Sequence, residues 1–489
     1  MINESLPEYI FIRICILLLH YIAPLSILFS ILFLIFPDVY HIPPWLQTYL
    51  FAEALFYLLI YVPQNSYLQR AAVHPMALTR DERRDLFNRC TTTAPDLERY
   101  LSGWFKHAPL SHIRRDNVKQ FFSWAFLNKD NHSAEDDREL DGYVDGLEQR
   151  LGWELAPGRG SATSLRLTVD SVNMLHRSLL WYLIVALVDT VTHARLLMHS
   201  FSFYRLPFSR FLTVFPFRPL TFFSRHQTPA RTLTYWYRPH TSKTKLPVLF
   251  IHGIGIGLHP YVDFLAEPND SIHTDEDEVG IIALEIMPIS FRITTPIPRK
   301  EQMRAEILSI LKKHEWHKVV LVTHSYGSVI ATHLLQTPET ASRIGPIVLI
   351  DPVSFLLHIP DVAYNFTARP PKSASEWQLW YFASKDPGVA HTLARQFFWA
   401  ENILWREDLH GRKVTVVLCG KDLIVDTEAV GRYLGDSPKS DDSWKTQAWR
   451  GEELDILWYP DLNHSQVFGE RDDRGRILRA IGSYCRRQP

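Results

Sequence analysis

"KVVLVTHSYGSVIATHLL", residues 318–335, is the stretch that decides the fold. Its β-branched beginning predicts a buried strand, and its end predicts a helix. A sharp polar turn with Ser325 at its tip separates the two. The residues two before and two after such a tip approach each other and must be small; Gly327 meets that demand fully and Thr323 only in part. The stretch therefore predicts a strand–turn–helix unit in which Ser325 is either a nucleophile or an ordinary turn serine.

From about Thr232 onward, apolar runs alternate with helical patterns, which predicts an α/β fold with a doubly wound, mostly parallel sheet. The alternating stretch 231–239 is typical of an edge strand, whereas continuous apolar runs indicate strands that are buried on both faces. These runs occupy residues 246–253, 280–288, 318–323, 344–352, 413–420 and 453–460, and residues 300–316 form an amphipathic helix. Ligands of such sheets bind beyond the carboxyl ends of the strands, so the polar residues that follow the strands are the candidates for a site.

A reactive serine needs a histidine to accept its proton and a carboxylate to orient that histidine. Asp422 directly follows a predicted strand, and His464 is the single histidine after Asp422 although the chain contains 22. Asp351 also ends a strand and is a rival for the acid, with a structural or capping role as its alternative; Asp426 is a weaker rival. We predict Ser325 as nucleophile, His464 as base and Asp422 as orienting acid.

A glycine turn, "HGIGIG" at residues 252–257, follows the first buried strand. Repeated glycines let the backbone turn tightly and bring amide N–H groups close to a substrate. His252 and Gly253 are therefore candidate binding residues, although a histidine at such a position is often simply packed and hydrogen-bonded.

The composition excludes several classes of protein. Lysine plus arginine (52) nearly balances aspartate plus glutamate (53), so no overall charge favours nucleic acid. The four cysteines are far apart, which indicates neither a zinc site nor a disulfide framework. The H-E-x-x-H arrangement and clustered carboxylates do not occur in the sequence, and we predict no metal and no cofactor.

The N-terminus predicts a membrane anchor within residues 1–70. The first apolar run, residues 14–36, is long enough to cross a hydrocarbon core of roughly 30 Å. A cleaved signal peptide is the alternative, but acidic residues precede the run and no small-x-small cleavage site follows it. The second run, residues 45–62, carries Glu53 and is either a second span facing the first or a helix in the interface. Arginines after this run place the bulk of the protein on the cytosolic side if both runs span.

Residues 71–230 are expected to form a helical, partly membrane-associated linker region. A third apolar run, residues 178–198, contains Asp189 and predicts a helix packed on the membrane or on the catalytic half rather than a span. In residues 200–225 four arginines alternate with eight phenylalanines, and no acidic residue occurs between Thr190 and Val262. This pattern suits a phospholipid headgroup boundary; the alternative is a basic linker whose phenylalanines pack on the next domain. In residues 71–170 we identify no chemistry.

Over residues 232–487 the chain resembles the α/β-hydrolase superfamily. "HGIG" resembles its oxyanion loop, "THSYGS" its nucleophile elbow, "GKDLIV" its acid turn and "NHSQVF" its histidine loop. The resemblance implies the roles given above for the serine, acid and histidine, and it implies that the backbone N–H groups of Ile254 and Tyr326 are oxyanion donors. The layout, with hydrophobic segments ahead of residues 231–489, resembles membrane-associated fungal members.

The resemblance also implies a cap over the site at about residues 352–412. This stretch contains eleven aromatic residues that either line an apolar acyl pocket or merely pack the cap. Together with an anchor, it predicts a serine esterase or lipase-like enzyme that acts on a lipid or another hydrophobic ester, with membrane lipids as partners. An acyltransferase with the same triad, and a catalytically silent binding protein, are the alternatives.

Overall fold

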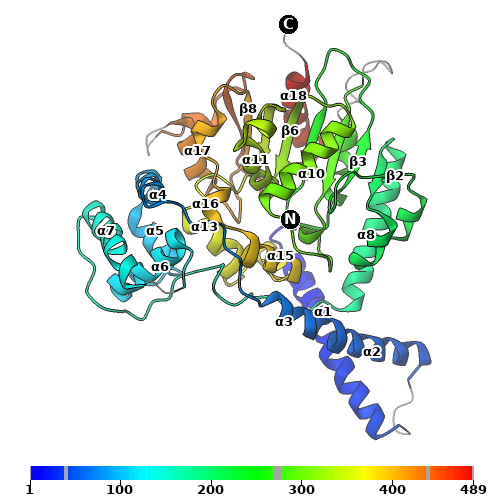
Figure 1. Cartoon of the computed structure of the whole chain (residues 1–489). Helices are drawn as coiled ribbons and strands as arrows, with labels where there is room; N and C mark the ends of the chain where they lie inside the picture. The colour runs from blue at the N-terminus through cyan, green and yellow to red at the C-terminus, as the bar shows by residue number, and fades with distance from the viewer. Residues whose placement is uncertain (1, 38–41, 131–132, 268–277, 437–440, 487–489) are drawn as a thin grey trace.

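The computed structural model describes residues 2–37, 42–130, 133–267, 278–436 and 441–486. The stretch between the first two apolar runs, "PDVYHIPP" at residues 37–44, contains three prolines and predicts a turn. Its residues 38–41 lie outside the described part of the chain. A mixed, mostly parallel sheet forms the centre of the molecule, and helices cover both of its faces (Figure 1).

The described strands form one sheet in the order β2-β1-β3-β5-β4-β6-β7-β8-β9. All neighbours from β5 to β9 pair in parallel, and β3 is antiparallel to both of its neighbours. The bounds are β1 Ser202–Arg205, β2 His226–Gln227, β3 Thr234–Arg238, β4 Val248–Ile251, β5 Ile281–Glu285, β6 Val319–His324, β7 Ile344–Ile350, β8 Val414–Cys419 and β9 Leu454–Tyr459. The α/β class and the predicted strands are confirmed.

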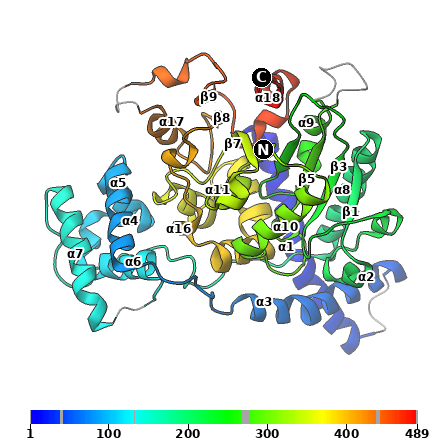
Figure 2. The ribbon, with the colours of Figure 1, turned by 45° about the horizontal axis from the view of Figure 1, so that its top comes forward.

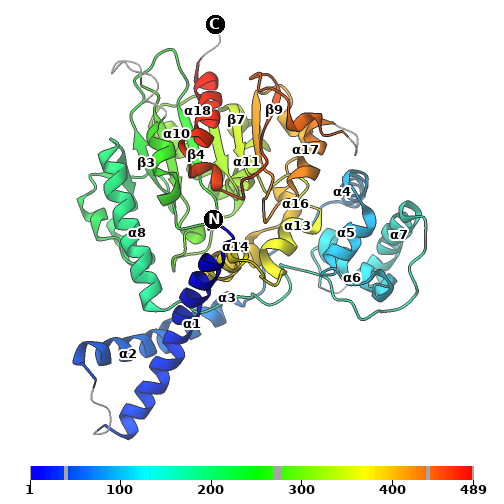
Figure 3. The same cartoon turned by 180° about the vertical axis from the view of Figure 1, so that it is seen from behind.

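The apolar runs are continuous because both sheet faces are covered. In β6, Leu321 packs on the side of α10 (Lys300–Lys313) and α11 (Gly327–Leu335), whereas the next residue, Val322, packs on the side of α9 (Val262–Ala266) and α18 (Arg471–Cys485). Successive strand residues point to opposite faces, so both must be apolar here. Figures 1 and 3 show α10 and α11 on one face and α18 on the other.

Residues 231–239 do contain a strand, but the prediction that it lies at the edge of the sheet is wrong. Its core, β3, lies inside the sheet between β1 and β5, and its side chains are buried except for the half-buried Tyr237. Tyr235 and Tyr237 pack on one face of the strand and Trp236 on the other. Thr234 and Arg238, which share the face of Trp236, bind Glu285 and the carbonyl of Ala266. Residues 202–227, before the expected start of the hydrolase domain, supply the two outer strands.

A helical insertion separates β7 from β8 over the stretch expected to be a cap. It contains α13 (Pro360–Ala363), α14 (Ala374–Gln378), α15 (Pro387–His391) and α16 (Trp399–Asn402), together with three π-helical turns. The remaining helices of the C-terminal half are α12 (Pro338–Ala341) and α17 (Thr427–Gly435).

A bundle of N-terminal helices packs against this cap (Figure 2). It comprises α4 (Arg80–Thr93), α5 (Leu97–Trp104), α6 (Arg115–Leu127) and α7 (Ala134–Leu151). Gly103 contacts Pro360 of the cap so closely that a Cβ on the glycine would lie 2.4 Å from the proline Cγ. Arg99 binds Asp361 at 2.8 Å, and the Trp399 indole of the cap donates a hydrogen bond to the carbonyl of Ala125 at 3.0 Å. The bundle and the cap therefore form one packed layer.

Among the described residues, three helices are long and apolar enough to cross a membrane: α1 (Leu6–Ile35), the continuous helix Pro44–Leu68, and α8 (Leu179–Met198). The second comprises α2 (Pro44–Phe56), a π-helical stretch and α3 (Val62–Leu68). Figure 3 shows α1 and α2 projecting away from the sheet. The N-terminal end of α1 is held on the cap: the Ala374 N–H donates to Glu4, just before the helix, at 2.9 Å, and the Arg13 guanidinium lies 3.7 Å from the centre of the Trp377 ring.

Glu53, the acidic residue within the second apolar run, does not face outward. Its side chain is fully buried and accepts a hydrogen bond from the N–H of Leu179 at 2.8 Å, while Tyr49 and His176 lie 3.2 Å from its oxygens. The carboxylate thus sits at the N-terminus of α8, where unpaired N–H groups and the helix dipole favour negative charge. A carboxylate that faced lipid would be unfavourable, and here contacts within the protein stabilise it.

Candidate active site

Ser325 occupies the tip of a tight turn between β6 and α11. Its φ is +51°, a left-handed conformation that non-glycine residues rarely adopt, and its N–H donates to the carbonyl of Ile350 at 2.9 Å. Such strain persists only where surrounding contacts enforce it, and it is typical of functional turns. The turn lifts the serine hydroxyl above the carboxyl ends of the strands.

The elbow closes because two glycines let backbones approach it. A Cβ on Gly327 would lie 2.5 Å from the carbonyl oxygen of Ile251 and 3.2 Å from the Cβ of Thr323. A Cβ on Gly253 would lie 2.7 Å from the Cβ of Ser325. Thr323 is accommodated because the residue opposite it has no side chain; its own hydroxyl is buried and has no hydrogen-bond partner among the described residues.

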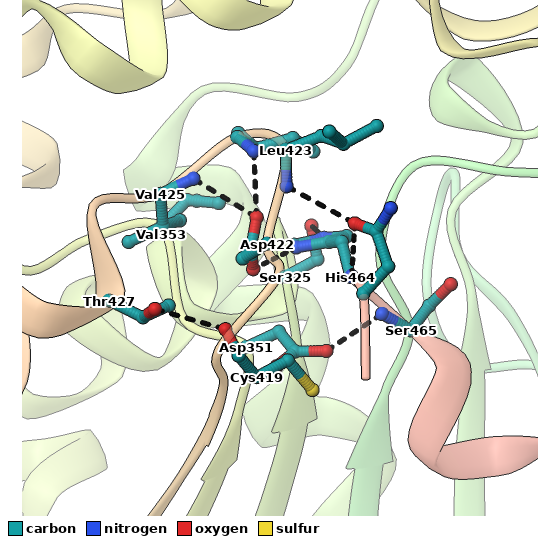
Figure 4. A network of polar contacts seen from close by, with 12 residues as sticks. Ser325, Asp351, Val353, Cys419, Asp422, Leu423, Val425, Thr427, His464 and Ser465 are labelled. Atoms are coloured by element: carbon teal, nitrogen blue, oxygen red, sulfur yellow. Dashed lines mark hydrogen bonds and ion pairs between the residues drawn. The ribbon is translucent and has the colours of Figure 1, made fainter. Parts of the chain in front are cut away.

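The predicted base and acid meet the serine in a continuous hydrogen-bonded chain (Figure 4). His464 Nε2 lies 2.9 Å from Ser325 Oγ, and His464 Nδ1 lies 2.7 Å from Asp422 Oδ2. All three groups come from turns after strands, which bring their side chains to one edge of the sheet although 139 residues separate serine from histidine. The tautomer with a proton on Nδ1 leaves Nε2 free to accept the serine proton.

Backbone groups hold the acid in place. The second oxygen of Asp422 accepts the N–H groups of Ile424 at 2.7 Å and Val425 at 3.0 Å. Asn463 receives the N–H groups of Leu423 and His464 at 3.2 and 2.7 Å, which ties the acid turn to the histidine loop. With every oxygen of Asp422 engaged, rotation of this carboxylate would break several hydrogen bonds at once.

The environment favours the charged form of His464. Burial alone would lower the pKa of its imidazole, but the negative charge of Asp422 and the hydrogen bond to it outweigh burial and raise the pKa above its ordinary value. The adjacent acid thus makes His464 a stronger base than an ordinary buried histidine.

The rival acids have other partners. Asp351 is fully buried with φ +43°, and it accepts the N–H of Ser465 at 2.7 Å, directly after the histidine. Asp426 accepts the Ala429 N–H as the N-cap of α17 and lies 3.1 Å from the Arg99 guanidinium of the helical bundle. Neither makes a hydrogen bond to His464 among the described residues, so Asp422 is the carboxylate that the fold brings to the base.

A second buried histidine, His324, precedes the serine and was missed by the sequence analysis, although it stands within the quoted stretch. Its Nδ1 lies 2.8 Å from the hydroxyl of Tyr261, and its Nε2 lies 3.8 Å from Asp351, beyond hydrogen-bond distance. Burial lowers the pKa of His324, which favours the neutral ring. This residue packs beneath the elbow and does not contact Ser325 through a hydrogen bond.

The four predicted binding residues separate into two pairs. Ile254 and Tyr326 line the cavity beside Ser325, and their backbone N–H groups have no hydrogen-bond acceptor among the described residues. His252 is fully buried, accepts the N–H of Ile286 at 3.0 Å and lies 2.7 Å from the carbonyl of Gly253; burial lowers its pKa to about 4. Neither His252 nor Gly253 lines the cavity: the first is a packed histidine, and the second provides close approach to Ser325.

A largely apolar cavity opens beside Ser325, with an empty volume of about 670 Å³ that includes some open solvent. Three parts of the chain line it. The elbow and the neighbouring turns supply Ile254, Tyr326, Val353 and Ile424; the cap supplies Leu357, Val362, Phe366, Leu393, Phe397 and Trp399; and the helical bundle with the segment after it supplies Trp104, Trp124 and Leu167.

The contribution of residues 71–170 was missed. The indole of Trp104 donates to the carbonyl of His358 at 2.9 Å, and that of Trp124 donates to Thr168 Oγ1 at 2.8 Å, so both rings are fixed toward the cavity. No local pattern marks these two residues, because their place depends on how the bundle docks on the cap. Of the eleven aromatic residues in the cap, only Phe366, Phe397 and Trp399 line this cavity; most of the expected pocket aromatics pack elsewhere.

One group of described residues has the spacing of a metal site: Asp351, Asp422 and His464 place ligand atoms within 4.8 Å of one another. Most of these atoms are already engaged, since Asp422 Oδ2 binds His464 Nδ1 and Asp351 Oδ2 binds the Ser465 N–H; Asp351 Oδ1 alone has no hydrogen-bond partner among the described residues. The remaining nitrogen of His464 points at Ser325. This donor set fits a hydrogen-bonded network and offers a cation no free cluster of oxygens.

The strand order, the strained serine between β6 and α11, and the chain order serine, acid, histidine define the α/β-hydrolase fold. No family model and no curated protein matches the sequence.

Among solved structures, the chain is similar to a membrane phospholipase A described as a bacterial virulence factor, at 11% identity and a TM-score of 0.39, over 62% of this chain and 93% of that one. A putative lipase from Acinetobacter baumannii gives 12% identity and a TM-score of 0.38, over 60% and 93% of the two chains. Naproxen esterase from Bacillus subtilis gives 12% and 0.34, over 52% and 89%.

Proposed function

We propose that the protein is a membrane-anchored serine hydrolase that cleaves the carboxylester of a lipid or another hydrophobic acyl compound. The observation that carries the proposal is the chain Ser325–His464–Asp422, with contacts of 2.9 and 2.7 Å, at the wall of an apolar cavity. Ser325 is the nucleophile, His464 the general base and then acid, and Asp422 the orienting carboxylate.

In this mechanism Ser325 Oγ attacks the ester carbonyl carbon while its proton passes to His464 Nε2. The carbonyl oxygen becomes an oxyanion that the N–H groups of Ile254 and Tyr326 stabilise. Protonated His464 then donates this proton to the alcohol oxygen as the C–O bond breaks, which leaves an acyl-serine. Water repeats the sequence and releases the carboxylic acid, and serine and histidine return to their initial states.

Two features support a hydrophobic substrate at a membrane. Apolar groups dominate the cavity wall, which suits an acyl chain. The N-terminal end of the apolar helix α1 contacts the cap through Glu4 and Arg13, so the anchor ends beside the layer that covers the site. An acyl lipid would therefore have to move only a short way from the bilayer to the cavity.

Fluorophosphonate labelling of the detergent-solubilised full chain tests the nucleophile. We expect wild type to be labelled and Ser325→Ala not, because the probe reacts with an activated serine oxygen; the exposed Ser342→Ala variant is the control and should label like wild type. His464→Ala should label at least about 10³ times more slowly. Labelling that survives Ser325→Ala would sink the assignment.

A panel of esters with increasing acyl length tests the substrate class. We expect kcat/KM to rise with chain length until the cavity is filled, since each buried methylene adds about 0.8 kcal/mol. A marked preference for short, water-soluble esters would contradict the hydrophobic substrate.

The anchor has its own experiment. Because α1 and the helix Pro44–Leu68 are long enough to span, we expect the chain to stay in the membrane pellet after carbonate extraction. We further propose a cytosolic catalytic half, from the arginines that follow the second run. Protease added to sealed vesicles of known orientation should then digest it without detergent, and protection would reverse the topology.

A further inference from the structure

The candidate spans differ in how much of their surface the protein covers, and α8 is the one bound along its whole length. At its start, the N–H of Leu179 binds Glu53. In the middle, Asp189 lies 2.8 Å from Arg218 and 2.5 Å from Arg292, and near the end Arg195 binds Asp263 at 2.5 Å. One face of α8 is therefore fixed to the catalytic half, which leaves only its other face for contact with anything else.

The outer face of α8 is apolar. Its exposed residues recur at helical spacing: Leu180, Leu183, Ile184, Leu187 and Val191. Leu183 and Leu187 are 64% and 63% exposed, which is unusual for two leucines one turn apart on a helix that is otherwise packed.

Phenylalanines form a second apolar group beside the helix. The segment between β1 and β2 packs on α8 through Phe215, whose ring lies 5.2 Å from Tyr182 and 5.7 Å from Phe56 of α2. From there the rings follow one another at 4.5–5.7 Å in the order Phe215, Phe217, Phe211, Phe222 and Phe208. The outer end is open to solvent: Phe223 is 80% exposed and Leu212 is 75% exposed. We call this segment, residues 208–223, together with the outer stripe of α8, the lateral surface; α8 lies at the end of the sheet that carries β2, the strand that follows this segment (Figure 1).

The charges around the lateral surface are positive. Of the four arginines that the sequence places among the phenylalanines, Arg218 is not available, because it is buried between Asp189 and Glu285. The other three, Arg205, Arg210 and Arg225, form no ion pair among the described residues, and Arg205 lies 3.5 Å from the centre of the Phe208 ring. The Arg205 guanidinium also donates to the backbone carbonyls of Ser224 and Leu206 at 3.2 and 3.0 Å. Exposed aromatic rings edged by arginines that have no acidic partner among the described residues suit the interface of a bilayer with anionic headgroups.

We propose that the lateral surface lies against an anionic phospholipid bilayer, with the α8 stripe and the phenylalanines at the level of the acyl boundary and the three arginines at the headgroups. Continuity with the anchor supports a bilayer, since the ring chain begins at Phe56 in the second apolar helix. A second copy of the chain fits less well, because the same three arginines would face each other without acidic partners. The attachment is thereby a third contact, beyond the two N-terminal helices, and it fixes the orientation of the catalytic half.

Depth-dependent quenching in nanodiscs tests this on the full chain, with Cys15→Ser as background. An NBD label is placed at Phe223→Cys or Leu187→Cys on the lateral surface, and at Glu339→Cys on α12 as control, a residue that is 70% exposed. In discs with one-fifth phosphatidylserine we expect a blue-shifted emission at positions 223 and 187 and at least a twofold loss of intensity with doxyl-labelled lipid, but neither effect at 339. Water-like emission at 223 and 187 would overturn the proposal, as would shielding that appears only with two proteins in a disc.

The arginines are tested by charge. Removing phosphatidylserine, or introducing Arg210→Gln with Arg225→Gln, should reduce the quenching at position 223. Arg84→Gln on α4, an exposed arginine on the other side of the molecule, should not (Figure 1). Quenching that is equal in all lipids and variants would overturn the anionic part. The inference rests on the proposed anchorage but not on the reaction: Ser325→Ala should leave quenching unchanged, while loss of the chain on carbonate extraction would break the anchorage itself.

Discussion

Around Ser325, two regions of the molecule build the site in different ways. In the C-terminal half, the serine, acid and histidine come from turns that directly follow strands, and backbone hydrogen bonds fix each of them. In the N-terminal half, Trp104 and Trp124 reach the cavity from helices that dock on the cap. The groups of the proposed reaction are therefore positioned by short turns, whereas the shape of the substrate cavity depends on packing between distant segments. Substitutions in the first region should change the rate, and those in the second should change the choice of substrate.

The largest effect should come from the acid. Asp422→Asn keeps the shape but removes the charge that orients His464, and we expect kcat to fall by about 10³–10⁴. The substitution should also change the pH dependence of the rate. The rate falls as pH drops through the raised pKa of His464, because the protonated ring cannot accept a proton; without the negative charge this pKa is lower, so the acid limb should move to lower pH.

Asp351→Asn is the matched control for that experiment. Its amide oxygen can still accept the N–H of Ser465, so we expect less than about a tenfold loss and an acid limb that moves less than in Asp422→Asn. If Asp351→Asn caused the larger loss and the larger shift, the assignment of the acid would have to be reversed.

Gly327→Ala should test the elbow. The added Cβ would lie 2.5 Å from the carbonyl oxygen of Ile251, a backbone atom that cannot move alone. We expect the free energy of unfolding, measured by denaturant titration, to fall by about 1–3 kcal/mol. The proposed activity, measured by ester hydrolysis, should fall as well. Gly142→Ala is the control, because a Cβ there meets no atom within 4 Å. Equal stability of the two variants would show that the turn is looser than described.

Trp104→Phe should shift selectivity instead of rate. The smaller ring leaves more room in the cavity, and we expect the ratio of kcat/KM for long over short esters to change by about tenfold. Trp444→Phe, a buried tryptophan that does not line the cavity, should leave the ratio unchanged. If both variants behave alike, the helical bundle does not select substrate.

The smallest effect concerns Thr323. Thr323→Val keeps the shape and removes a buried hydroxyl that has no partner in the described part of the chain, so we expect stability to be unchanged or up to about 1 kcal/mol higher, with activity retained. A large loss in thermal or chemical stability would show that this hydroxyl makes a contact that the elbow needs.

The strands of the catalytic half, the elbow and the order of the three polar turns could be predicted from the sequence alone. These features depend on neighbours within a few residues: apolar runs mark buried strands, and Gly327 marks a backbone that must pass close to another. His464 could be selected because no other histidine follows Asp422.

The sequence does not distinguish Asp422 from Asp351, because both follow strands. In the folded chain Asp422 binds His464, whereas Asp351 binds the N–H of Ser465. The contact between Glu53 and the start of α8, and the burial of Arg218 beside Glu285, could likewise be seen only in the structure. The same holds for the position of β3 inside the sheet and for Trp104 at the cavity. In each case the partner lies far away along the chain. Hydropathy and spacing report the local demand of a residue for burial or a polar partner, but which distant group meets that demand is fixed by packing.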